Sequence, residues 1–393
     1  MSKRFTSYLM TIIIISLAIA PAFALGEGNI NLLLIAILGL SPMIILLYRR
    51  VYYIDILLVL FMLSILIFPL IFHPESMRWS TVLYSYMFTL TFIAYNKLLH
   101  KNFFSINNYV EVLKYLIYAY FIVLLIQQFC VLNGLPIFNE SNYYPSAPWK
   151  LNSLSAEPSH SARIVALLMY VYITAKEIFQ NKKYNFSREI KEDKWVWVSF
   201  LWTMLTMGSG TAFLFIAVVL LKFMRFKNIF FLSIIVITIV IGIEMLNVNT
   251  FKRTFDVLIA TLTFDIDTIM KADHSASLRI VPMMIISQMV DLTTLNGWFG
   301  HGIDFTGTFL STLIYGLPPG SSGGGMFQLW MEYGFLSFFL FVFFSLNAVY
   351  QKNEYLSLIF WFLLVFMYGV NNQMVWLAII LLYTNKYFYK RKN

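Results

Sequence analysis

Long apolar segments separated by short polar stretches fill most of this 393-residue chain. An α-helix needs roughly 20 apolar residues to cross a bilayer, and most of these segments approach that length. The twelve segments lie at about 8–25, 30–48, 54–72, 79–96, 109–132, 161–178, 195–207, 211–223, 228–246, 326–348, 355–370 and 373–386. The pattern predicts an all-α fold, a polytopic transmembrane helix bundle of about 12 spans that forms a single domain over residues 1–393.

Three of the segments, at 195–207, 211–223 and 373–386, are shorter than a bilayer requires. We expect their helices to borrow flanking residues or to cross where the membrane is locally thin. The sequence Gly208-Ser209-Gly210 separates the first two of them. Glycine and serine favour turns, so a tight hairpin is predicted at this point.

Composition supports a membrane protein and removes several functional classes. The chain is 60% hydrophobic and 12% charged, with a mean hydropathy of +0.74, which excludes an ordinary soluble globule. Its single cysteine, Cys130, excludes a disulfide framework and a cysteine metal site. Walker and GxGxxG motifs do not occur, and neither do HExxH or an exterior GxSxG, so a nucleotide-driven pump and a metal or serine hydrolase are disfavoured.

Lys and Arg divide unequally between the two predicted faces. With both termini in the cytoplasm, 21 of the 28 basic residues fall on the cytoplasmic side, which is the direction that the positive-inside bias favours. This division accounts for most of the net charge of +9, so we expect no nucleic-acid partner. The first segment follows Ser2-Lys3-Arg4 and contains Ala22-Phe23-Ala24, a signal-peptide pattern that leaves its cleavage open without changing the orientation.

Two segments outside the cytoplasm are long enough to carry chemistry. Residues 133–160 are rich in Pro, Ser and Asn without periodicity, which predicts an irregular loop that ends where Pro158 begins a helix and Glu157 caps it. Residues 247–325 form a larger loop, which we expect to be partly helical. Loops of this length in a compact domain are more often functional than idle.

The basic residues on the exterior face run against the charge bias and therefore need a reason. They could anchor the chain at the lipid head groups, form local ion pairs or bind an anionic substrate. The seven residues are Arg78, Lys150, Arg163, Lys252, Arg253, Lys271 and Arg279.

Arg279 is the strongest anion-binding candidate among them. Pro282 fits a helix best within its first turn, so the sequence predicts that a helix over 280–290 begins near Leu278 or Arg279. A guanidinium beside free helix amides is suited to a phosphate group. The alternative is an ion pair between Arg279 and Asp273 or Asp291.

Glu157, His160 and Arg163 follow one another at spacings of three, which places them along one face at the outer end of the sixth segment. They combine an acid, a titratable imidazole and a permanent cation at the level of lipid head groups. A structural ion pair between Glu157 and Arg163 through His160 is the alternative interpretation.

Two glycine-rich turns in the large loop complete the candidates. Gly300-His301-Gly302-Ile303-Asp304 is a tight turn in which the backbone can approach a ligand, and Ser321 and Ser322 precede three glycines that could form an amide nest. Glycines before a helix are also common in plain turns.

In its layout the chain resembles bacterial O-antigen polymerases and, more distantly, O-antigen ligases. The resemblance rests on the number of spans, on Glu157-Pro158-Ser159 after a mid-chain exterior loop, and on Arg279, an apolar helix and Phe299-Gly300-His301-Gly302 in a large late loop. Ser321 and Ser322 stand where ligases have a histidine, which weakens the ligase interpretation. The turn at Gly208 lacks the arginine that such relatives often have.

This resemblance implies a metal-independent, polyprenyl-diphosphate-dependent glycosyltransferase without a cofactor, at the periplasmic face of a bacterial inner membrane. Its donor and acceptor would be undecaprenyl-diphosphate-linked oligosaccharides, and a chain-length regulator is a possible partner beside membrane lipids. Arg163, Arg253 and Arg279 are then expected to hold the diphosphate. Glu157 or His160 is the first choice of general base and His301 the second. The loop turns at Gly300, Gly302, Asp304, Ser321 and Ser322 are expected to contact the substrate.

Two other functions stay open. A ligase shares the donor and differs in the acceptor, whereas a lipid-linked oligosaccharide flippase or an ion-coupled transporter places ionisable groups and broken helices near the membrane midplane. Every acid or base here falls within about two turns of a predicted span end, with Glu244 and Glu332 the deepest. That distribution favours an enzyme at the surface.

Overall fold

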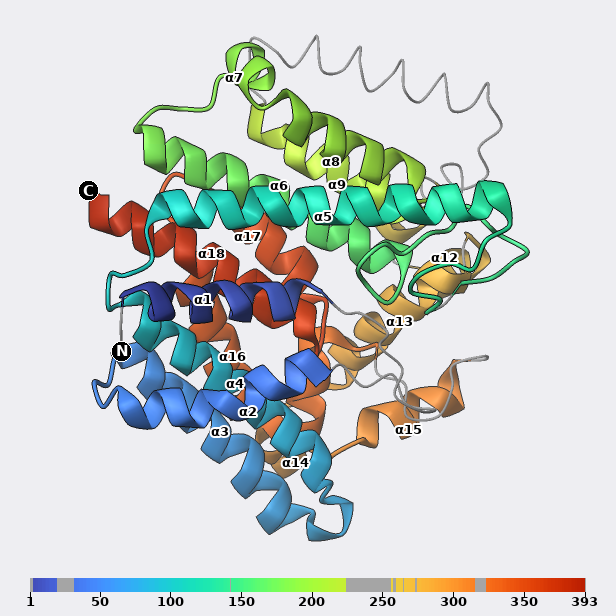
Figure 1. Cartoon of the computed structure of the whole chain (residues 1–393). Helices are drawn as coiled ribbons and strands as arrows, with labels where there is room; N and C mark the ends of the chain where they lie inside the picture. The colour runs from blue at the N-terminus through green and yellow to red at the C-terminus, as the bar shows by residue number, and fades with distance from the viewer. Residues whose placement is uncertain are drawn as a thin grey trace. The chain divides into compact units, whose positions relative to one another are not determined.

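The computed structural model describes residues 3–19, 32–141, 143–223, 256, 259–263, 265–272, 274–314 and 323–392. Helices and their connections make up this part of the chain and none of its residues forms a strand, so the all-α prediction is confirmed there (Figure 1). In the same ranges three helices are long and apolar enough to cross a membrane: α3 (Tyr53–Phe72), α5 (Ile106–Asn133) and α16 (Gly325–Val349). The protein is therefore a helical protein with the composition of a membrane protein, and the count of twelve spans stays a prediction.

Helices occupy the predicted apolar segments closely, apart from that at 228–246, which lies outside the described residues. A continuous apolar run satisfies its backbone hydrogen bonds locally as a helix, so such segments can be located without tertiary information. The other elements that correspond to predicted segments are α1 (Lys3–Ala18), α2 (Leu32–Leu47), α4 (Trp79–Leu99), α6 (Pro158–Gln180), α8 (Lys194–Thr206), α9 (Gly210–Leu220), α17 (Leu356–Trp361) with the π-helical turn η4 (Phe362–Phe366), and α18 (Gln373–Lys392).

The chain forms two compact units. Unit 1 comprises Met1–Leu17, Leu34–Phe103 and Ala260–Lys386, and unit 2 comprises Ala18–Leu33, Phe104–Ile259 and Tyr387–Asn393. Whether they behave as the single domain predicted from the sequence stays a prediction, and each unit is described by itself.

In unit 1 the antiparallel helices α3 and α4 are joined by the short 3-10 turn η1 (Pro74–Ser76), and α3 packs along α16. Aromatic side chains fill the contact: the rings of Phe61 and Phe341 lie 5.1 Å apart, and Phe341 meets Trp376 of α18 at 5.6 Å. The hydroxyl of Ser337 donates to that of Ser64 at 2.9 Å. Close helix packing with a small polar contact is the usual arrangement where lipid surrounds a bundle.

The large predicted loop adds four helices to unit 1 within its described part: α12 (Ile266–Ala272), α13 (His274–Met289), α14 (Leu295–Phe299) and α15 (Phe305–Leu313). Three of them, α12, α13 and α15, share an apolar core that includes Ile269, Val281 and Leu310 and reaches Met331 of α16. Phe299 of α14 stacks on Phe72 of α3 at 4.3 Å. The prediction of a partly helical loop is confirmed for these residues, and the loop is packed against the long helices of its own unit.

The start of α13 differs from the prediction. The helix begins at His274, and both Arg279 and Pro282 lie inside it. A proline inside a helix removes one backbone hydrogen bond and is tolerated where packing compensates, and here Val281 beside it is fully buried. The expectation that Arg279 stands at a helix start was therefore wrong.

Unit 2 is built on α5 and α6, with α8 and α9 packed beside them. The predicted hairpin between 195–207 and 211–223 is confirmed, because α8 ends at Thr206, α9 begins at Gly210, and Gly208 between them has a φ of +71°. The short helix α7 (Phe186–Glu192) precedes α8, and the 3-10 turn η2 (Leu221–Phe223) follows α9. Both therefore lie at the helix ends away from the hairpin turn.

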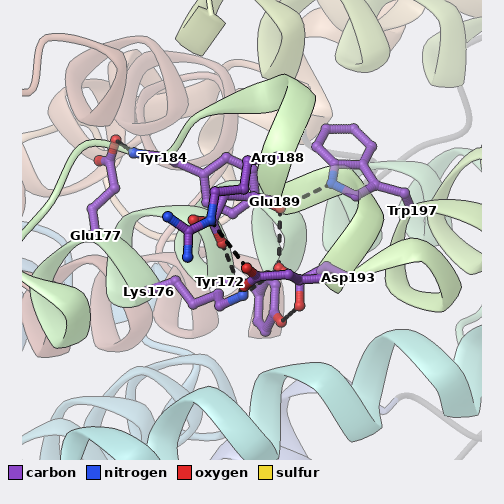
Figure 2. Close-up of polar contacts among 9 residues, drawn as sticks. Tyr172, Lys176, Glu177, Tyr184, Arg188, Glu189, Asp193 and Trp197 are labelled. Atoms are coloured by element: carbon purple, nitrogen blue, oxygen red, sulfur yellow. Dashed lines mark hydrogen bonds and ion pairs between the residues drawn. The ribbon is translucent and has the colours of Figure 1, made fainter.

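A polar network ties α6 to the start of α8. Lys176 lies between Glu189 at 3.2 Å and Asp193 at 2.6 Å, and the hydroxyls of Tyr172 and Tyr184 donate to Asp193 at 2.9 and 3.1 Å (Figure 2). The ammonium faces two carboxylates, of which Asp193 also accepts from the two hydroxyls, so these largely buried charges are compensated. We interpret this network as structural.

Candidate functional site

The predicted site residues that the structure describes fall into two groups. Glu157, His160 and Arg163 belong to unit 2, whereas Arg279 and the turn from Gly300 to Asp304 belong to unit 1. Arg253, Ser321 and Ser322 lie outside the described residues. Arg279 is described only as a member of α13.

The loop that leads to Glu157 is irregular, as predicted, and a set of amide side chains holds its shape. Gln127 of α5 donates to Oδ1 of Asn152 at 2.9 Å and accepts from the backbone N–H of Ser153 at 2.8 Å. Asn139 donates to the carbonyls of Ser153 and Ser155 at 2.7 and 2.9 Å. These bonds satisfy backbone groups that have no helix partner, and they seat the start of α6 against α5.

Glu157 and His160 form a carboxylate–imidazole pair at the start of α6. The helix begins at Pro158, as predicted, and Glu157 is its N-cap residue but makes no side-chain cap hydrogen bond. The carboxylate instead accepts from the hydroxyl of Ser159 and lies 3.3 Å from Nε2 of His160. Their side chains are 28% and 35% exposed, so solvent or substrate can reach both groups. Such a pair can exchange a proton with a bound hydroxyl group.

Arg163 lies one turn further along α6 and is only 6% exposed. Arg163 is thus buried, whereas His160 is partly exposed. An arginine keeps its charge even when buried, so Arg163 provides a permanent positive charge beside the pair.

The Gly300-His301-Gly302 turn in unit 1 docks onto the backbone of α16. The N–H groups of His301 and Gly302 donate to the carbonyls of Met331 and Glu332 at 2.8 and 3.2 Å. Gly300 has a φ of +87°, and a Cβ there would collide with the carbonyl of Glu332. Only glycine fits this approach without strain.

A break in α16 makes this docking possible. Gly334 has φ +82° and ψ 170°, so α16 is interrupted at this residue. In an unbroken helix the carbonyls of Met331 and Glu332 would accept from residues one turn later. At the break they accept from the Gly300–Gly302 turn instead, and α14 fills the space beside Gly334, where a Cβ would collide with the carbonyl of Trp298.

The turn between α3 and α4 supplies two further partners of this site, His73 and Arg78. Nε2 of His73 donates to the carbonyl of Gly300 at 2.9 Å, since a carbonyl can only accept. Nη1 of Arg78 donates to Oδ2 of Asp304 at 2.6 Å. Arg78 was a candidate for an anchor or a local ion pair, and the structure shows the ion pair. No local signal could reveal these contacts, because the partners are 227 and 226 residues apart.

The surroundings of His301 disfavour its protonated form. Its ring stacks on Phe305 with centroids 4.6 Å apart, and Nδ1 lies 3.4 Å from the amide nitrogen of Asn296. Burial lowers the pKa of His301, and the positive charge that His73 can carry lowers it further. A neutral imidazole at pH 7 is available as a proton acceptor.

Glu332 lies directly at the break and is 3% exposed. Oε1 accepts from Nε2 of Gln328 at 3.0 Å, and Thr306 of α15 faces the same carboxylate. The hydroxyls of Thr306 and Tyr333 are buried and make no hydrogen bond of normal geometry within the described part of the chain. No motif in the sequence marks Glu332, although it is one of the two ionisable residues that lie deepest in the predicted spans.

Within the described ranges, no three His, Cys, Asp or Glu side chains converge in a way that could hold a metal ion. No protein-family model, curated protein or solved structure matches this chain. The function is therefore inferred from the chain's own residues and geometry.

Proposed function

We propose that this protein is an O-antigen polymerase, a glycosyltransferase that joins undecaprenyl-diphosphate-linked oligosaccharide units at the periplasmic face of the inner membrane. The observation that carries the proposal is the Glu157–His160 pair at the start of α6, with Nε2 and Oε1 3.3 Å apart. Under the predicted orientation this pair lies at the membrane surface, where a lipid-linked sugar presents its reacting groups.

The reaction requires one proton acceptor and stabilisation of one leaving group. The acceptor's sugar hydroxyl loses its proton to the Glu157–His160 pair, and its oxygen forms a bond to the anomeric carbon of the donor. The bond between that carbon and the diphosphate oxygen breaks, and undecaprenyl diphosphate leaves with the electron pair. Arginine side chains stabilise the charge that develops on it. Arg163 is the arginine whose burial the structure describes. The diphosphate-binding roles of Arg253 and Arg279 stay predictions.

An ion-coupled transporter of lipid-linked saccharides is the second candidate, because one observation favours it. The break in α16 at Gly334 and the buried carboxylate of Glu332 beside it are features that transporters place at their ion sites. The polymerase is preferred because the Glu157–His160 pair is accessible, whereas Glu332 is not.

The two functions differ in what a deletion strain accumulates. A polymerase deletion leaves surface polysaccharide with a single repeat unit, and a gel then shows loss of the ladder above that band. A flippase or transporter deletion removes every unit from the surface. We expect the single-unit band, with the ladder restored by the wild-type gene on a plasmid. Absence of the single-unit band would overturn the polymerase assignment and favour a transporter or a ligase.

A further inference from the structure

His73 contacts the Gly300-His301-Gly302 turn directly. It ends α3, its side chain is 21% exposed, and its Nε2–H donates to the carbonyl of Gly300 at 2.9 Å. This bond places the proton of the neutral ring on Nε2. Nδ1 is then the atom that takes a second proton, and it faces Oε1 of Glu75 at 3.7 Å.

The turn is enclosed between two elements of unit 1. On one side the carbonyls of Met331 and Glu332 accept its N–H groups. On the other side Gly302, with a φ of +97°, approaches so closely that a Cβ would meet the Cβ of His73 at 3.1 Å and would collide with the hydroxyl of Ser76. The backbone of His301 is thus clamped between α16 and the turn that follows α3.

We propose that His73 is a positioning residue, which fixes the Gly300-His301-Gly302 turn and thereby presents the His301 imidazole as a proton acceptor. The use of His301 in the reaction rests on the proposed polymerase function. The clamping of the turn rests on its contacts with His73, Ser76 and α16 and does not depend on that function.

The electrostatic part of the proposal involves the charged groups around His301. His73 and Glu75 approach from the α3–α4 turn, Arg78 is neutralised by Asp304, and Glu332 lies on α16. A positive charge on His73 would oppose a second positive charge on His301. Burial and this repulsion together lower the pKa of His301.

The test uses the full-length protein purified in detergent and diethyl pyrocarbonate, which acylates only the neutral imidazole. The rate of His301 modification, followed by mass spectrometry of its peptide, is measured against pH. His73→Gln keeps an N–H donor near the position of Nε2 but removes the titratable charge. We expect the midpoint for His301 to rise by about half a pH unit, as for one partly screened charge, with an unchanged rate at high pH.

Two further variants separate position from charge. His73→Phe removes the hydrogen bond to Gly300 as well, so the turn loosens and the His301 rate at high pH rises several-fold. His100→Gln is the matched control, because His100 caps the other helix of the pair, α4, through Asn96, and it leaves the His301 profile unchanged. An unchanged midpoint in His73→Gln, or an unchanged high-pH rate in His73→Phe, overturns the positioning role.

The catalytic consequence is read from the polysaccharide ladder of cells grown at a series of external pH values. A higher midpoint means that His301 is protonated at a higher pH, so chain growth in His73→Gln should fail at a less acidic pH than in wild type. A shifted labelling midpoint with an unshifted ladder overturns the use of His301 as the acceptor. That outcome leaves the polymerase function standing on Glu157 and His160, whereas failure of the polymerase function itself appears in the deletion strain.

Discussion

Nη1 of Arg78 lies 2.6 Å from Oδ2 of Asp304, which joins the start of α4 to a turn 226 residues later in the chain. The hydrogen bond and the charge of Asp304 raise the pKa of Arg78, so this exterior cation is paired. Asp304 adopts a φ of +63°, a left-handed conformation that, among residues other than glycine, Asp and Asn adopt most readily. The pair therefore connects the last residue of the Gly300–Asp304 turn to the start of α4.

Arg78→Ala and Asp304→Asn should each lower the thermal midpoint only slightly, because their side chains are 62% and 41% exposed and solvent screens the attraction. The fall in thermal midpoint of the double variant should not exceed the sum of the two single falls. Any coupling between the two substitutions should vanish at high salt. Thermal unfolding of the purified protein at low and high salt measures this. A strong coupling that survives high salt would show that the pair is buried in the working protein.

Gly334→Ala should destabilise unit 1 severely. The substitution costs about 1–3 kcal/mol for the positive φ alone, and its Cβ also collides with the backbone of Trp298. Gly39→Ala is the matched control, since Gly39 lies inside α2 with nothing within 4 Å of its Cβ, and it should stabilise by about 0.5–1 kcal/mol. Thermal unfolding compares the two. Equal midpoints would mean that α16 is not broken at Gly334.

Glu157→Gln and His160→Ala should each abolish chain growth while leaving the protein in the membrane. The first removes the carboxylate and keeps the size, and the second removes the imidazole, so neither retains the proton-accepting pair. The polysaccharide ladder and an immunoblot of membranes provide the two readouts. Full-length polymer from both variants would eliminate the pair and leave His301 as the base.

Arg279→Lys distinguishes a chemical role from a general positive charge. A diphosphate leaving group gains from the planar fork of arginine, and loss of one such preorganised donor costs on the order of 100- to 1000-fold in rate. We expect normal insertion but little or no polymer, with Arg279→Ala no better. Because Arg279 lies inside α13, helix amides cannot replace it. Near-normal ladders in the Lys variant would make Arg279 an anchor and transfer its role to Arg163 or Arg253.

The predicted orientation can be tested with a reporter that is active only outside the cytoplasm. Fusions after Ser153 in the exterior loop at 133–160 and after Asp273 in the exterior loop at 247–325 should be active, and a fusion after Asn185 should be silent. The physical reason is the excess of Lys and Arg on the cytoplasmic side. The reverse pattern of activity would place both candidate groups in the cytoplasm and remove the proposed function.

Much of the helical framework could be predicted from the sequence because its causes are local. The segment predicted at 54–72 is α3 (Tyr53–Phe72), and the one predicted at 326–348 is α16 (Gly325–Val349). Apolar runs of this length satisfy their own backbone hydrogen bonds as helices. The start of α6 at Pro158 was also predictable, since proline fits the first helical position.

The sequence by itself thus determined where most of the long apolar helices lie and that Glu157 and His160 share one face at a helix start. Tertiary structure decided the environment of the second group. α16 is broken at Gly334, where Trp298 occupies the space that a Cβ would fill, and the carbonyls of Met331 and Glu332 at the break accept from the turn that holds His301. The start of α13 and the contacts of His73 and Arg78 could not be predicted from the sequence either. Each depends on packing between segments far apart in the chain, and no local pattern of residues encodes such contacts.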